Sequence, residues 1–220
     1  MFADRIDAGQ RLGANLREFI DRECAGEETV VLALPRGGVP VGYQVAKALG
    51  SPLDVFVVRK LGAPQQPELA MGAIASGGVR VINEEVVRAL RVTPEQLAET
   101  AERETLELER REQAYRGDRA PLDVNGKCVL LVDDGVATGY TMRAAVAALR
   151  QREPRKIVVA APVAAQDTCE DLKRHADAVI CLMTPYDFAA VGQWYRHFDQ
   201  TSDEEVRLLL ERAAETNRSS

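Results

Sequence analysis

The feature that most limits the fold is a series of short apolar runs separated by stretches of helical periodicity. Several runs are apolar at every position, which is typical of strands covered on both faces. Alternating strands and helices favour a parallel sheet with helices on both sides. The expected strands are residues 29–34, 54–58, 79–82, 128–132, 157–161 and 178–182, and the expected helices include residues 41–49, 141–150, 167–175 and 203–213. We therefore predict an α/β fold with a parallel sheet of about five strands.

Length and charge restrict the classes of protein further. A chain of 220 residues that is 46% hydrophobic and 28% charged can bury one core, so we expect a single domain over residues 1–220 with a frayed end at 217–220. A net charge of −6 argues against nucleic-acid and anionic-membrane partners. No apolar run approaches the roughly 18 to 20 residues of a membrane helix. The first residues are neither basic nor followed by an apolar stretch, so we expect no signal peptide and a cytoplasmic protein.

The cysteines and histidines form no recognisable ligand pattern. Cys24, Cys128, Cys169 and Cys181 are scattered without a C-x-x-C pair, and the two histidines share no ligand spacing. Cys128 and Cys181 lie within apolar runs, where a thiol usually behaves as a small hydrophobic group. We therefore expect neither a disulfide framework nor a zinc site.

One long segment interrupts the alternation. Thr93 can cap a helix that has Pro94 at its first position and Gln96 three residues after the cap. The helix is expected to end near Arg116, before Gly117. It carries opposite charges at i,i+4 spacing and a narrow apolar stripe made by Leu97, Ala101, Leu108 and Tyr115. Two interpretations stay open: a solvated helix on one edge of the sheet, or a surface for a partner such as a second copy.

Residues 129–142 carry the chemistry. Asp133 and Asp134 close a buried strand, and two adjacent carboxylates are costly there unless they bind hydroxyls, cations or basic side chains. The following loop has glycines that allow close approach, and it leads into a helix whose free N–H groups favour an anion. Thr138 and Thr141 add hydroxyl donors. Carboxylates for a diol beside a nest for a phosphate suit a sugar phosphate.

Two other interpretations of this loop are weaker. A nucleotide P-loop needs four residues between its glycines, followed by Lys and Ser or Thr. Only three residues separate Gly135 from Gly139, and Tyr140 stands at the position of the lysine. A structural turn with a chance acidic pair would need the whole pattern to be coincidental.

Residues 129–142 resemble the phosphoribosyl pyrophosphate signature of type I phosphoribosyltransferases, most of all the adenine-using branch. The likeness of the whole chain points to a bacterial subgroup that is named only by its similarity to these enzymes. The resemblance implies that Asp133 and Asp134 contact the ribose hydroxyls, directly or through Mg²⁺. Relatives of the hypoxanthine-guanine type have an aspartate where this chain has Ala137, so no general base is assigned there. The donor-binding residues implied are Asp133, Asp134, Gly135, Ala137, Thr138, Gly139, Tyr140 and Thr141.

Two further segments correspond to the pyrophosphate site of this family. The segment at 34–42 alone would suit an ordinary strand-to-helix turn, but it resembles the family's pyrophosphate loop, which often contains a non-proline cis peptide. That bond would join Pro35 to Arg36. Arg59 and Lys60 could simply be solvated cations at a sheet edge. By resemblance, either cation would offset the charge of the pyrophosphate, so the implied set is Pro35, Arg36, Gly37, Gly38, Arg59 and Lys60, with Arg59, Lys60, Asp133 and Asp134 as the catalytic candidates.

The acceptor side is less defined. Residues 61–78 show little periodicity and match the position of the family's mobile catalytic loop, which closes over the substrate and excludes water. Aromatic residues gather at about 183–200, where the family has a small hood region that stacks on the base, and the N-terminus is a second candidate contributor to this hood. Phe188 and Trp194 are the candidates for stacking, although ordinary packing under a terminal helix explains them equally well.

The resemblance therefore implies transfer of the 5-phosphoribosyl group from phosphoribosyl pyrophosphate to a nitrogenous base, with Mg²⁺ as the cofactor and a homodimer as the expected assembly. The alternative is a non-catalytic module that senses phosphoribosyl pyrophosphate or a nucleotide. A hydrolase is disfavoured, because the chain has no Gly-x-Ser-x-Gly. The sequence does not identify the acceptor base.

Overall fold

The main sheet has five strands and is parallel throughout. The computed structural model describes residues 1–218, and the order of strands in this sheet is β2-β1-β6-β7-β8. Its strands are β1 (Thr29–Ala33), β2 (Leu53–Val55), β6 (Cys128–Val132), β7 (Lys156–Val163) and β8 (Ala178–Met183). The predicted parallel sheet of about five strands is confirmed.

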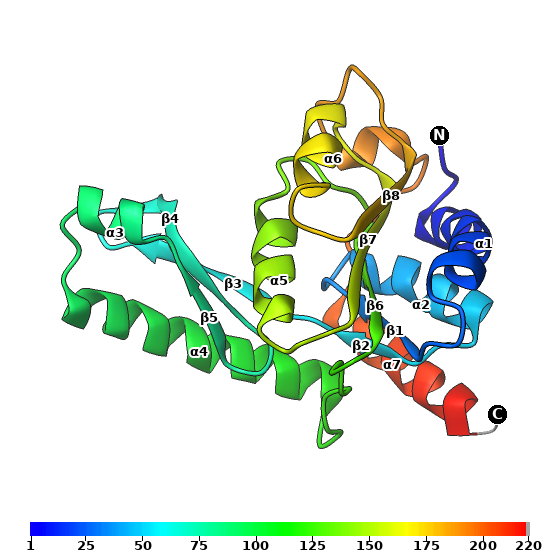
Figure 1. The fold of residues 1–220 in the computed structure, drawn as a ribbon, viewed down its shortest axis with the longest axis horizontal. Helices are drawn as coiled ribbons and strands as arrows, with labels where there is room; N and C mark the ends of the chain where they lie inside the picture. Colours follow the sequence, from blue (N-terminus) through cyan, green and yellow to red (C-terminus); the bar gives the residue numbers. More distant parts are fainter. Residues whose placement is uncertain (219–220) are drawn as a thin grey trace.

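Helices cover both faces of this sheet (Figure 1). One apolar cluster joins alternate strand residues such as Leu130 to α1 (Arg5–Glu23), α2 (Gly38–Leu49) and α7 (Asp203–Arg218). The other joins the intervening residues, such as Leu131, to α5 (Tyr140–Arg150) and α6 (Gln166–Leu172). Successive side chains of a strand point to opposite faces, so strands apolar at every position build two cores at once. The helix α1 is absent from the helices expected from the sequence.

The segment expected to be an irregular loop is instead a second sheet. Strands β3 (Val58–Ala63), β4 (Gln66–Ala75) and β5 (Val79–Ile82) pair antiparallel in that order. The expectation of little regular structure at 61–78 is therefore wrong. A Cβ added at Gly72 would overlap the Val81 carbonyl, and one at Gly62 would lie 2.5 Å from the Pro67 oxygen. Glycines that resembled loop signals thus permit close strand approach, while mobility of this segment stays a prediction.

Two of the predicted strands also differ from the structure. The expected strand at 54–58 is divided between β2 of the main sheet and β3 of the small sheet. The strand at 79–82 exists, but it belongs to the small sheet and is not parallel. Antiparallel pairing over this segment depends on contacts distant in sequence, which local periodicity does not contain.

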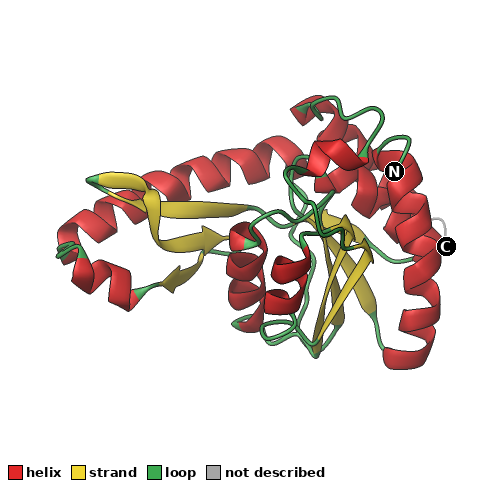
Figure 2. Cartoon of the chain, turned by 90° about the horizontal axis from the view of Figure 1, so that it is seen from above, coloured by secondary structure: helices red, strands yellow, loops and turns green. Residues whose placement is uncertain are grey.

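The small sheet forms an arm with α3 (Glu84–Ala89) and α4 (Pro94–Arg116), and this arm extends from the main body (Figure 2). The cap of α4 is as predicted: Thr93 Oγ1 accepts from Gln96 N at 3.3 Å, and Gln96 Oε1 accepts from Thr93 N at 3.0 Å. At its other end Arg116 forms a buried ion pair with Asp54 at 3.1 Å. The helix packs on the small sheet, on β2 and on α7, which differs from the expected edge of a single sheet.

The N-terminus joins the expected hood at 183–200. Phe2 N donates to Trp194 O at 2.7 Å, and Arg196 N donates to Phe2 O at 2.9 Å. Phe2 and Tyr195 belong to a third apolar cluster beside the 3-10 helix η1 (Val191–Trp194). Residues 217–218 continue α7, and the rest of the end that was expected to fray, Ser219 and Ser220, lies outside the described residues. Within residues 1–218, no helix has the length and apolar character needed to cross a membrane.

Candidate functional site

Two loops meet at the carboxyl edge of the main sheet. Strands β1 and β6 are neighbours, with Ala33 opposite Val132, and Leu34 N donates to Val132 O at 2.9 Å. The loops that follow these strands therefore begin side by side. A Cβ on Gly37 would overlap the Asp134 carboxylate, so only glycine allows this contact. The structure thus brings the predicted Pro35–Gly38 segment against the predicted acidic pair, at the edge where ligands bind in open α/β sheets.

The two carboxylates of the pair have different partners. Asp133 Oδ1 accepts the backbone N–H of Asp134 at 2.9 Å. Asp134 Oδ2 accepts from Arg5 Nε at 2.8 Å, and the two side chains are only 13% and 12% exposed. The Arg5 guanidinium lies 3.9 Å from the centre of the Phe198 ring. The acidic pair is thus partly neutralised by a cation from α1, which the sequence analysis did not identify because it did not predict α1.

Burial sets the electrostatics of this pair. It raises the pKa of Asp133 well above its ordinary value, and the neighbouring charge of Asp134 raises it further. Burial also raises the pKa of Asp134, while Arg5 opposes that shift. Burial raises the pKa of the Tyr195 hydroxyl, which donates to the Asp134 carbonyl at 2.5 Å. Two carboxylates that are costly to ionise favour a ligand that brings hydroxyl donors or a cation.

The loop after the acidic pair is held from behind by β7 and α6. Val136 N donates to Val163 O at 2.9 Å, and Thr168 Oγ1 donates to the Ala137 carbonyl at 2.6 Å. These bonds keep the other side of the loop toward solvent, where Thr138 and Thr141 are exposed. Gly139 has a φ of 72° and precedes the first turn of α5. The first N–H groups of a helix have no partner within it, so an anion is favoured at this point.

A second cation missed by the sequence analysis borders this loop. Arg143 Nη1 donates to Asp171 at 2.8 Å and lies 3.4 Å from the Thr138 carbonyl. Its guanidinium covers the ring of Tyr140 at 4.6 Å from the centroid, while Tyr140 remains 71% exposed. Arg143 could have been predicted from its position one helical turn after Gly139, because this spacing places its side chain beside the loop.

The predicted pyrophosphate loop contains the expected backbone feature. The peptide bond between Pro35 and Arg36 is cis. Gly37 and Gly38 then lead directly into α2. Arg36 Nη1 lies 3.6 Å from Asp203 Oδ1 of α7, so the side chain is tethered near the loop.

Arg59 and Lys60 lie on the arm. Arg59 Nη2 donates to Glu104 of α4 at 2.6 Å, and Lys60 Nζ lies 3.2 Å from Glu68 Oε2. Both line a cavity of about 620 Å³ between β3, the β3–β4 turn and α4. Among the described residues, neither forms a hydrogen bond or ion pair with the loop at 133–141. Their contact with pyrophosphate stays a prediction and requires these ion pairs to open.

Phe188 and Trp194 stack on each other in the hood, with ring centroids 6.5 Å apart and planes at 18°. Both pack against the cluster around Phe2 and Tyr195. The Trp194 Nε1 is buried without a hydrogen-bond partner in the described structure. Ordinary packing accounts for most of this contact, and base stacking by either ring stays a prediction.

A family model decides the class of protein. The model described as the phosphoribosyl transferase domain matches residues 3–195, which include both loops, the arm and most of the hood. This chain belongs to the phosphoribosyl transferase family. The resemblance of residues 129–142 to this family is therefore confirmed over nearly the whole chain, and the five-stranded parallel sheet agrees with it.

Relatives of similar sequence support the same family. A Mycobacterium tuberculosis protein, whose name marks its phosphoribosyl transferase activity as unproven, is 46% identical over 213 residues. The match covers 97% of this chain and 47% of that protein, so the chain spans about half the length of this curated relative. The crystal structure of TT1426 from Thermus thermophilus has a TM-score of 0.84 at 42% identity and covers 96% of this chain and 98% of its own. In Listeria monocytogenes, the bifunctional protein PyrR is 56% identical over 39 residues, 18% of this chain and 21% of PyrR.

Proposed function

We propose that this phosphoribosyl transferase family member transfers the 5-phosphoribosyl group from phosphoribosyl pyrophosphate to a nitrogenous base and releases pyrophosphate. The observation that carries the proposal is the arrangement of Asp133 and Asp134. They lie between the start of α5 and the Pro35–Gly38 loop. A sugar carrying a phosphate at one end and a pyrophosphate at the other presents a diol between two anions. The order of groups in the site corresponds to the order of groups in the donor.

Each group has a defined task in this proposal. The N–H groups near Gly139 and the hydroxyls of Thr138 and Thr141 bind the 5-phosphate. Asp133 and Asp134 accept hydrogen bonds from the ribose hydroxyls, which relieves the cost of their burial. The Pro35–Gly38 backbone and Arg36 bind the leaving pyrophosphate. Such donors stabilise charge that develops as the bond to the leaving group breaks.

Magnesium fits this donor set. Asp133 has one hydrogen bond from Asp134 and no cation partner among the described residues, and oxygen ligands are those that Mg²⁺ prefers. Asp133 and Asp134 would hold the ion indirectly, through ribose hydroxyls or water. When bound, Mg²⁺ supplies positive charge for the pyrophosphate oxygens. Because Arg5 already pairs with Asp134, Asp133 is the carboxylate whose negative charge the ion would mainly offset.

The arm and the hood would complete the active site. We propose that the arm moves to bring Lys60 and Arg59 toward the pyrophosphate and to exclude water, as catalytic lids do. Phe188 and Trp194 are proposed to contact the base. We further propose that the enzyme is a homodimer, which sedimentation of the full chain would test.

A binding module that senses phosphoribosyl pyrophosphate or a nucleotide is the alternative function. The Arg59–Glu104 and Lys60–Glu68 pairs favour it, because they keep both cations on the arm. The acidic net charge disfavours a regulator that binds nucleic acid. A sensor needs only donor affinity, whereas an enzyme also needs the arm cations in the transition state.

The experiment measures pyrophosphate release from the donor with Mg²⁺ and a panel of purine, pyrimidine and nicotinate-type bases. Lys60→Ala should lower kcat by about 10²-fold or more with donor affinity changed only a few-fold. Glu99→Gln, on α4 in the same cavity, serves as the control and should keep kcat within about 2-fold. Donor binding without release for any base would reject transferase activity toward the panel and favour the sensor.

A further inference from the structure

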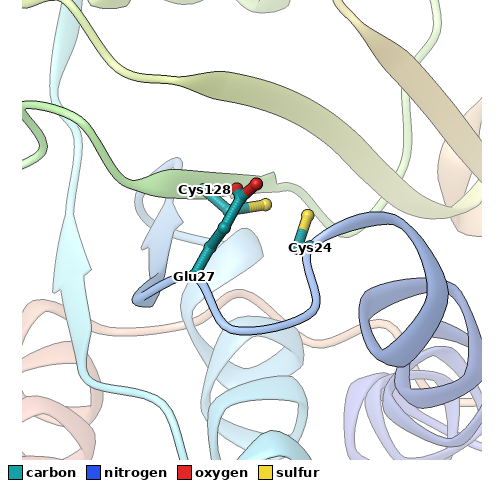
Figure 3. Close-up of side chains that lie close together, drawn as sticks. All are labelled: Cys24, Glu27 and Cys128. Carbon is teal, nitrogen blue, oxygen red and sulfur yellow. The ribbon is translucent and has the colours of Figure 1, made fainter.

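A second cluster of reactive side chains lies at the end of the main sheet opposite the candidate active site. Cys24 and Glu27 lie in the connection between α1 and β1, and Cys128 is the first residue of β6 (Figure 3). Thr29 and Cys128 are partners in the sheet register, at the amino ends of parallel strands. The two thiol sulfurs and a carboxylate oxygen all lie within 4.8 Å of one another.

The backbone fixes the three residues relative to each other. Glu27 N donates to the Cys24 carbonyl at 3.0 Å, which places both side chains on one turn. Cys128 N donates to the Glu28 carbonyl at 2.9 Å, which ties β6 to the same turn. Gly26, between the two turn residues, has a φ of 76°. A Cys-x-x-Glu turn facing a third ligand from a strand has the spacing of a metal-binding knuckle, in which two ligands are separated by two residues.

The carboxylate of Glu27 is poised toward the thiols. Its Oε1 accepts from Arg155 Nε at 2.8 Å. Its Oε2 is buried and has no hydrogen-bond partner among the described residues. A buried carboxylate oxygen without a partner is costly, so a ligand for it is expected. Arg155 orients the glutamate in the manner in which outer groups orient metal ligands.

The thiols of Cys24 and Cys128 lie close together, and both are shielded from solvent. Cys24 is 2% exposed and Cys128 is fully buried. Burial raises the pKa of the Cys128 thiol, and the adjacent Cys24 thiol raises it further. A cavity of about 670 Å³, lined by Cys24, Glu27 and Lys127 among others, gives access from solvent.

We propose that Cys24, Glu27 and Cys128 bind one Zn²⁺ ion, with water from the cavity as the fourth ligand. A tetrahedral ion at about 2.3 Å from each sulfur needs its sulfurs about 3.8 Å apart, which is compatible with donor atoms that all lie within 4.8 Å of one another. Two thiolates and a carboxylate are a donor set that suits a borderline-soft divalent ion. On binding, each thiol loses its proton to solvent and no electron is transferred. The ion would join the end of α1 to the centre of the sheet.

The chain offers a matched control. Cys169 and Cys181 form another pair of thiols, with Sγ atoms 3.7 Å apart, and no other residue forms a metal-ligand group with them in the described structure. A pair without a carboxylate provides too few ligands for a specific site. Metal binding should therefore depend on the first pair and not on the second.

The test titrates Co²⁺, a spectroscopic substitute for Zn²⁺, into the reduced 220-residue protein after treatment with a chelator. We expect one equivalent to produce the intense visible bands of tetrahedral Co²⁺ and a thiolate charge-transfer band, and one equivalent of Zn²⁺ to remove both. Cys24→Ser and Cys128→Ser should abolish these bands. Glu27→Gln, which keeps the size and shape of the side chain, should weaken the affinity by at least about 10-fold. The Cys169→Ser/Cys181→Ser variant should bind as the wild type does.

Three results would overturn the proposal. The wild-type protein could show only the weak spectrum of octahedral Co²⁺. The bands could persist in Glu27→Gln at unchanged affinity and in Cys24→Ser. They could also vanish in the Cys169→Ser/Cys181→Ser variant while surviving in Cys128→Ser.

Discussion

At the scale of single residues, the acidic pair combines a proposed binding role with a cost to stability. Asp133 lies beside Asp134, and within residues 1–218 only Asp134 of these two has an ion pair. The raised pKa of Asp133 means that the folded chain holds a proton more tightly than the unfolded chain. The free energy of unfolding therefore falls as pH rises from about 4, the ordinary value for Asp, through the raised pKa.

Asp133→Asn tests how much this buried carboxylate lowers the free energy of unfolding. The amide oxygen can still accept from Asp134 N, but the buried charge is gone, so we expect the free energy of unfolding at neutral pH to rise by about 1 kcal/mol. The fall of stability with rising pH should also become weaker. Chemical denaturation at several pH values measures both effects. An unchanged pH dependence would show that Asp133 is not the group responsible.

Removing the Arg5 cation should show how much the buried Asp134 carboxylate lowers the free energy of unfolding when it has no ion pair. Arg5→Met keeps the apolar stem and removes the cation, leaving Asp134 buried without its partner. We expect a loss of about 1–3 kcal/mol at neutral pH. The loss should shrink at low pH, where Asp134 is protonated, because Arg5 opposes the rise in its pKa. Arg11→Met, an exposed ion pair on the same helix, is the control and should cost less than about 0.5 kcal/mol.

Residues of the site differed in how well the sequence predicted them. Asp133, Asp134 and the Gly135–Thr141 loop follow a strand of unmistakable pattern, and the cis bond at Pro35 followed from the resemblance. Arg5 was not predicted, because its contact with Asp134 joins residues far apart in the chain. The expectation of no zinc site rested on spacing along the chain, whereas the proposed ligands Cys24, Glu27 and Cys128 come together only in the fold.

At the scale of elements, α4 is the support of the arm. Its cap and its apolar stripe agree with the sequence, because both depend on neighbours within a few residues. The elements against which α4 packs could not be predicted from the sequence. The strands β3 and β4 have glycines and a bulged register, which weaken the alternation that would identify them.

Two leucines on α4 provide a matched pair for testing its packing. Leu108 is buried at 2% exposure and Leu106 is 63% exposed. Leu108→Ala should cost about 2–4 kcal/mol of unfolding free energy, since a buried leucine leaves a cavity. Leu106→Ala should change it by less than about 0.5 kcal/mol when the chain is monomeric. A large loss in Leu106→Ala that grows with protein concentration would instead show that this face of α4 binds a second copy.

At the scale of the whole molecule, the main sheet has an apolar core on each face, and it positions the helices and the loops at its carboxyl edge. Residues such as Leu130 and Leu131 face opposite layers, so a continuous apolar run was enough to predict helices on both sides. The hood required more, because it joins Phe2 to Tyr195 across nearly the full length of the chain. The candidate site lies at the carboxyl edge of the sheet, and the arm and the hood, which are proposed to complete it, are two parts that local sequence patterns describe poorly.

We propose that the acidic-pair loop binds phosphoribosyl pyrophosphate, whether the chain is an enzyme or a sensor. Calorimetric titration of the donor with Mg²⁺ tests it directly, comparing wild type with the Asp133→Asn/Asp134→Asn variant and with Asp167→Asn as a surface control. We predict saturable binding by the wild type and the control, and a loss of at least about 100-fold in the double variant. Equal affinity of the folded double variant and the wild type would contradict the claim.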